Sequence, residues 1–103
     1  MSERLQAFLE LAKVDPKNTL VRYGIAMEHK NAGQPDEAVE AFEAVLAINP
    51  NYAAAYFHGG QTLEQAGRLE DAKSMYQRGI EVTTRTGDAH TRAELQAALD
   101  LLP

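Results

Sequence analysis

The chain has 103 residues, enough for one domain stabilised by packing alone, and it contains no cysteine, which excludes disulfides, thiolate metal sites and cysteine nucleophiles. Its net charge of -5 comes from 15 acidic and 10 basic residues without a dense run of Lys and Arg, so we expect no nucleic acid as a partner. Acidic residues interrupt the N-terminal stretch and no segment is apolar enough to span a membrane, which favours a cytoplasmic protein that binds no membrane.

Proline and glycine divide the chain into six segments rich in the helix formers Ala, Leu, Glu, Gln and Met. The sequence shows no strand-like alternation, so an all-α fold is predicted. The connections are short, and neighbouring helices must therefore run antiparallel. We expect helices over residues 2–14, 18–32, 36–48, 52–66, 70–83 and 88–102.

Apolar residues within these segments recur at helical spacing. In the first segment Leu5, Phe8 and Leu9 begin an i, i+3, i+4 pattern that Ala12 completes. Each such stripe can face another helix but cannot bury itself alone, so the helices must pack on one another. The third and fifth segments carry the same pattern at Ala38, Ala41, Phe42, Val45 and Leu46, and at Ala72, Met75, Tyr76, Gly79 and Ile80.

A fixed interval of 34 residues runs through the chain, as between Pro16 and Pro50. A period of this size is typical of stacked repeats rather than of a domain with one centre. Small residues in the shared register are expected where two helices cross, with an aromatic ring filling the space between successive hairpins. The residues in register include Phe8, Phe42 and Tyr76; Gly33 and Gly67; Ala26 and Gly60; and Ala38 and Ala72.

This pattern resembles the tetratricopeptide repeat, a helix–turn–helix unit of 34 residues. A repeat that begins at Thr19 matches the family at Ile25, Ala26, His29, Gly33, Ala38, Phe42, Val45, Leu46 and Pro50. The next begins at Ala53 and matches at Tyr56, Gly60, Leu63, Gly67, Ala72, Tyr76, Gly79 and Ile80. The resemblance implies a right-handed α-solenoid of about six helices that forms one domain over residues 1–103. Its parts would be a half repeat at 2–16, repeats at 19–52 and 53–86, and a capping helix at 87–103.

The chain departs from the family pattern at four positions. Arg22 replaces a large apolar residue and Gly59 a leucine. Thr84 replaces the closing proline, so the fifth helix is expected to run on towards Thr86. Glu94 stands where the last helix would need a small residue, which predicts that this helix caps the stack and starts no further repeat.

In the family the first helix of each pair lines a concave groove, which implies that contacts with a partner come from these helices. Tyr23 and Phe57 are expected to lie side by side there; the alternative is that both are partly buried against the neighbouring hairpin. Some members clamp a carboxylate with Lys and Asn residues. Those positions here read Tyr23, Met27 and His58, and only Arg92 matches in kind, so we expect no binding of an acidic chaperone tail. The predicted groove residues are Leu20, Tyr23, Met27, Lys30, Phe57, His58, Gln61 and Arg92, with Leu95 as a further candidate on the last helix.

No pattern for a metal, a cofactor or catalysis is present. His29, His58 and His90 lie on different predicted helices and form no i, i+4 pair. The two serines lie in no nucleophile motif. We therefore expect no cofactor, no metal and no enzymatic activity.

The leading hypothesis is a protein–protein interaction module whose groove holds a peptide or helix of a partner protein. The alternative is self-assembly as a homodimer, or docking on a larger protein, through the last helix. That helix carries more apolar residues than one packing face needs, namely Leu95, Ala98, Leu99, Leu101 and Leu102.

Overall fold

The computed structural model describes residues 2–103 and contains, in that range, six helices and no strand. The all-α class and the number of helices are therefore confirmed. No helix in the described range is long and apolar enough to cross a membrane. The helices are α1 (Glu3–Val14), α2 (Thr19–Asn31), α3 (Pro35–Ile48), α4 (Ala53–Gln65), α5 (Leu69–Thr86) and α6 (Ala89–Asp100).

Local sequence explains where these helices begin and end. The side chains of Ser2, Asn18 and Asp88 each accept a hydrogen bond from the backbone N–H three residues later, which caps the starts of α1, α2 and α6. Gly33 and Gly67 have φ of 72° and 78°, a left-handed conformation in which a side chain would be strained. Both glycines therefore stop a helix where the chain reverses.

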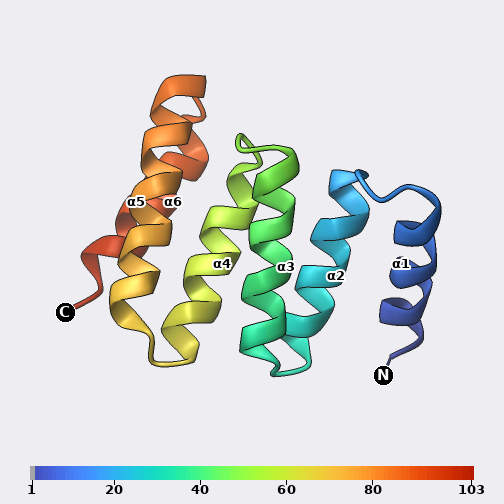
Figure 1. The fold of residues 1–103 in the computed structure, drawn as a ribbon. Helices are drawn as coiled ribbons and strands as arrows, with labels where there is room; N and C mark the ends of the chain where they lie inside the picture. The colour runs from blue at the N-terminus through green and yellow to red at the C-terminus, as the bar shows by residue number, and fades with distance from the viewer. Residues whose placement is uncertain (1) are drawn as a thin grey trace.

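The helices follow one another across the molecule in chain order, with α1 at one end and α5 and α6 at the other (Figure 1). The most extensive packing is within the pairs α2–α3 and α4–α5. The first helices of successive pairs also contact one another, α2 with α4 and α4 with α6. The backbones of α1, α3 and α5 do not approach one another in this way within the described chain, although Arg78 of α5 reaches Glu43 of α3 with its side chain at 3.0 Å. The axes therefore lie closer together on the α2–α4–α6 side.

Small residues allow the close helix crossings that the sequence predicts. Ala26, Ala38 and Ala72 have no exposed surface, and the rings of Phe42 and Tyr76 are buried beside them in one core. The predicted separation into small crossing residues and large filling residues is therefore confirmed.

The fifth helix runs one turn beyond the end of its counterpart in the first repeat. α5 has 18 residues and ends at Thr86, whereas α3 has 14. Thr84 lies inside α5, as its replacement of proline predicts, and Gly87 with φ of 79° ends the helix. The added turn displaces the start of α6 along the stack.

The register predicted for the last helix is wrong. The residues of α6 that pack on the core lie 39 positions, not 34, after their counterparts in α4, as the step from Tyr56 to Leu95 shows. Leu99, not Glu94, therefore occupies the place that Gly60 has in α4, and Glu94 is exposed. The set Leu95, Ala98, Leu99 and Leu102 repeats the spacing of Tyr56, Gly59, Gly60 and Leu63.

Candidate functional site

Five of the eight predicted groove residues meet where α2 packs on α4. The ammonium group of Lys30 donates a hydrogen bond to Gln61 Oε1 at 2.7 Å and lies 3.4 Å from His58 Nδ1. The His58 ring lies 6.1 Å from the Tyr23 ring and 5.3 Å from the Phe57 ring, measured between centroids. We call this set of residues the α2–α4 contact.

Charge and burial keep His58 neutral in this contact. Burial lowers the pKa of His58 below its usual 6.5, and the neighbouring Lys30 ammonium lowers it further. Burial also lowers the pKa of Lys30. A neutral imidazole can accept a hydrogen bond from Lys30 at Nδ1, which explains how a cation and a histidine share this space.

Tyr23 is chiefly a packing residue. Its ring lies 5.1 Å from that of Tyr52 and 6.1 Å from that of Phe42, so it is half-buried in the first hairpin. Burial, with a smaller contribution from Tyr52, raises the pKa of Tyr23. Tyr23 and Phe57 are linked through the His58 ring that contacts both.

The remaining predicted residues lie outside this contact. Met27 is partly buried and packs on the core, while Leu20 at the start of α2 is 69% exposed. Arg92 is exposed in the first turn of α6 and forms no ion pair within residues 2–103. Leu95 is wrong as a groove candidate, because it is completely buried in the core beside Gly79.

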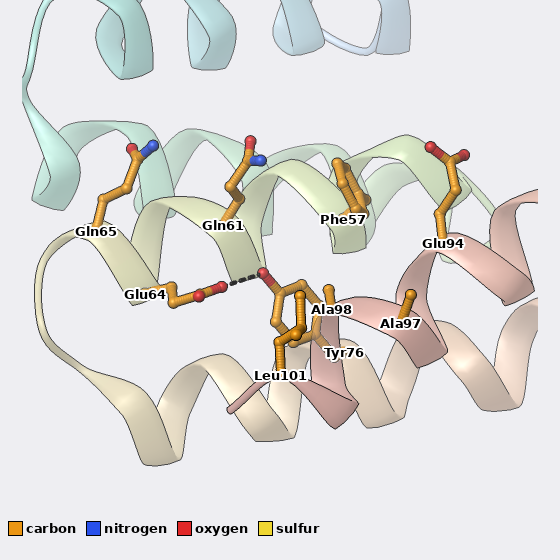
Figure 2. Close-up of a pocket in the computed structure, with 9 residues that line it drawn as sticks. All are labelled: Phe57, Gln61, Glu64, Gln65, Tyr76, Glu94, Ala97, Ala98 and Leu101. Carbon is orange, nitrogen blue, oxygen red and sulfur yellow. Dashed lines mark hydrogen bonds between the residues drawn. The ribbon is translucent and has the colours of Figure 1, made fainter. Parts of the chain in front are cut away.

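A cavity of about 590 Å³ opens between α4 and α6, with α5 as its floor (Figure 2). We call it the α4–α6 pocket. Apolar carbon comes from the Phe57 ring, from two alanines of α6 and from Leu101 directly after that helix. Polar groups come from two carboxylates, two amides and the hydroxyl of Tyr76. Its lining residues are Phe57, Gln61, Glu64, Gln65, Tyr76, Glu94, Ala97, Ala98 and Leu101.

A hydrogen bond orients one of the carboxylates in this pocket. The Tyr76 hydroxyl donates to Glu64 Oε2 at 2.8 Å, and the dashed line in Figure 2 marks this bond. Burial and the bond to Glu64 raise the pKa of Tyr76 far above its usual value, so the hydroxyl keeps its proton. Within residues 2–103, no three carboxylate or imidazole groups lie together as a metal site would require.

Sequence reasoning missed the part of this pocket that α6 contributes. The 34-residue period aligns Glu94 with the small residue Gly60, and it gives neither Glu94 nor Ala97 a role in the groove. The apolar stripe Leu95, Ala98 and Leu102 contained the signal, since its i, i+3, i+7 spacing shows which face of α6 packs on the core. That face places Ala97 and Glu94 beside α4.

Comparison with protein families matches residues 31–99 to the tetratricopeptide repeat. One relative is the probable UDP-N-acetylglucosamine–peptide N-acetylglucosaminyltransferase SPINDLY of barley (Hordeum vulgare), which is 33% identical over 95 residues. The match covers 85% of this chain but only 10% of the barley protein. This chain therefore spans a small part of that relative.

Two solved structures share the fold. The tetratricopeptide repeat domain protein of Salinibacter ruber is 33% identical, with a TM-score of 0.72 over 80% of this chain and 91% of that one. The type III secretion translocator chaperone SycD of Yersinia enterocolitica is 18% identical, with a TM-score of 0.85 over 93% of this chain and 67% of that one. The fold, the in-register repeats and the match over most of the chain agree: the chain belongs to the tetratricopeptide repeat family.

Proposed function

We propose that this chain is a non-catalytic protein–protein interaction module that holds a peptide or helix of a partner in a groove lined by α2, α4 and α6. The observation that carries the proposal is the closer approach of these three helices than of α1, α3 and α5, which favours a concave surface on their side. Stacked repeats use such surfaces for binding. The proposed contact residues are Leu20, Tyr23, Met27, Lys30, Phe57, His58, Gln61 and Arg92.

The chemistry of these side chains supports recognition of a protein segment. Aromatic residues, Met and Arg are enriched at the cores of interfaces. Phe57 and Met27 are only partly buried, so each keeps apolar surface that a partner can cover. The enzymatic name of the barley relative supports no catalytic role here, because this chain corresponds to a tenth of that protein.

A matched pair of double variants tests the groove. Phe57→Ala with Lys30→Ala removes apolar surface and charge on the α2–α4–α6 side, and it spares Tyr23, whose packing would confuse the result. Glu40→Ala with Glu81→Ala alters exposed residues of α3 and α5 as a control. Affinity capture followed by mass spectrometry should lose specific partners with the first variant and retain them with the second. If the groove variant captured the same partners in undiminished amounts, the binding site would lie elsewhere.

Self-assembly through α6 is a second candidate. Leu101 is 85% exposed, which supports it. Leu95, Leu99 and Leu102 pack on the core of their own chain, so the apolar surface left over is smaller than the sequence indicates. Light scattering over a concentration series should show a dimer that Leu101→Asp dissociates. A constant monomer mass would contradict this candidate.

We further propose that residues 2–103 work as one domain, with a half repeat at 2–16, repeats at 19–52 and 53–86, and a capping helix within 87–103. The continuous packing from α1 to α6 supports this division. Limited proteolysis should therefore find no cleavage site between the hairpins that releases a folded fragment.

A further inference from the structure

The α2–α4 contact and the α4–α6 pocket occupy equivalent places in successive repeats. Phe57, Gln61 and Glu64 of the pocket lie 34 residues after Tyr23, Met27 and Lys30. Likewise Tyr76 in the floor lies 34 residues after Phe42, whose ring contacts Tyr23. The two places can therefore be compared residue by residue.

In the first repeat the side chain of His58 fills this place. Its ring packs against Tyr23, and its Nδ1 faces the ammonium group of Lys30 at 3.4 Å. The chain itself thus supplies a side chain with a flat apolar body and a polar end that reaches residue 30.

In the second repeat no side chain of the described residues fills the equivalent space between α4 and α6. With the register of α6 set by Leu95, the residue equivalent to His58 is Ala97, 39 positions later. A methyl group there cannot reach Glu64, and the result is the cavity of about 590 Å³. The pocket is therefore the unfilled counterpart of the space that His58 occupies.

The charge of the pocket is reversed as well. Glu64 stands where the first repeat has Lys30, and Glu94 adds a second carboxylate from α6. Within residues 2–103 Glu64 forms no ion pair, while Glu94 lies 3.3 Å from the highly exposed His90. The nearby ammonium group of Lys30 is directed to Gln61 Oε1 and to His58.

We infer that the α4–α6 pocket binds a lysine or arginine side chain of the partner segment; the inference rests on the proposed groove function. The aliphatic stem of such a side chain lies against Phe57, Ala98 and Leu101, and its cationic end meets the carboxylates of Glu64 and Glu94. Long cationic side chains combine an apolar stem with a charged end in this way. The Tyr76 hydroxyl holds one oxygen of Glu64 and leaves the other for the cation.

Nuclear magnetic resonance of the 15N-labelled protein tests this with the peptide acetyl-Ala-Leu-Lys-Leu-Ala-amide as the probe. Saturable shifts are expected at the amides of Phe57, Ala97 and Leu101. A peptide with norleucine in place of lysine keeps the stem, loses the charge and should bind several-fold more weakly. Equal binding of the two peptides would overturn recognition of a cation.

Variants of the protein locate the effect. Glu64→Gln should weaken binding of the lysine peptide about threefold and the double variant with Glu94→Gln about tenfold, as expected for partly exposed ion pairs. Glu40→Gln removes the same charge from the exposed face of α3 and should change nothing. If Glu40→Gln weakened binding of the lysine peptide as much as Glu64→Gln does, the net charge of the protein would explain the effect, and the inference would be overturned.

Ala97→His should block the pocket, since it copies His58 of the first repeat. Lysine-peptide shifts that centre on Tyr23 and Met27 would overturn the pocket while leaving the groove as a binding surface. The groove proposal is tested separately, by affinity capture with the Phe57→Ala and Lys30→Ala double variant. Failure of the pocket and failure of the groove can therefore be told apart.

Discussion

At Gly60, a single hydrogen in place of a methyl group sets how closely α4 approaches α5. A Cβ atom at this position would lie 2.6 Å from Cδ1 of the Tyr76 ring, which is buried in the core and held by its hydrogen bond to Glu64. A Cβ at the adjacent Gly59 would instead meet Met75 Cε at 3.2 Å, the end of a flexible side chain. The two neighbouring glycines therefore differ in whether the surrounding structure can accommodate a methyl group.

The two glycines make a matched prediction. Gly60→Ala should lower the free energy of unfolding by about 2 kcal/mol through overpacking. Gly59→Ala should not lower it, because alanine favours the helix by about 1 kcal/mol and Met75 can yield. Urea denaturation followed by circular dichroism measures both. Equal effects would mean that Tyr76 shifts as easily as Met75.

Tyr76 also makes stability depend on alkaline pH. Its folded-state pKa is raised above the unfolded value of 10.0, so the native state keeps the proton longer, and the contribution to stability is present below pH 10 and lost above it. Tyr76→Phe should cost about 1 kcal/mol at neutral pH through the lost bond to Glu64. The difference between the two proteins should shrink above pH 10; an unchanged difference would contradict the assignment.

At the scale of the element, the last turn of α5 depends on the residue at position 84. Thr84 lies within the helix, where its Oγ1 donates to the carbonyl oxygen of Ile80 at 2.7 Å. Proline there would remove a backbone hydrogen bond and clash with the preceding turn. The length of α5, and with it the place of α6, therefore requires a residue other than proline.

Thr84→Pro should lower the free energy of unfolding by about 3 kcal/mol. Thr84→Ala is the matched control at the same exposed site and should stay within about 0.5 kcal/mol of the wild type. Chemical denaturation distinguishes the two. Similar stabilities would mean that the final turn of α5 contributes nothing to the stack.

At the scale of the whole molecule, the stack measures 37 × 29 × 18 Å, and each hairpin contacts only its neighbours. The stability of such a molecule is approximately a sum of repeat stabilities and nearest-neighbour interfaces, so α6 contributes through its packing on α5 and α4. α6 closes the core with Leu95, whose side chain would meet a Cβ placed on Gly79 at 2.8 Å.

Leu95 in α6 and Leu101 directly after it are expected to have different roles, Leu95 in closing the core and Leu101 in binding the peptide. Leu95→Ala should lower the free energy of unfolding by about 3 kcal/mol, because it leaves a cavity in the core. Leu101→Ala removes a side chain that is 85% exposed and should change stability by less than about 0.5 kcal/mol. The Leu101 variant should nevertheless bind the lysine peptide more weakly, because Leu101 lines the α4–α6 pocket. A thermal melt and the peptide titration together check both expectations.

Much of the fold could be predicted from the sequence because its determinants are local and repeated. The period that links Phe42 with Tyr76, and Ala38 with Ala72, specifies helices, their antiparallel order and their small and large packing positions. Thr84 in place of proline even indicated the overrun of α5. Each of these features rests on a spacing that can be counted along one chain.

The place of α6 and the pocket beside it were decided by the tertiary structure. One added turn in α5 offsets the last helix from the 34-residue period, so counting forward from the repeats put Glu94 at a crossing that Leu99 occupies. The same offset puts Ala97 where His58 stands one repeat earlier. Sequence alone thus determined the repeat. Burial and helix packing decided which side chains of α6 close the core and which leave a space, because those depend on contacts between helices rather than on spacing within them.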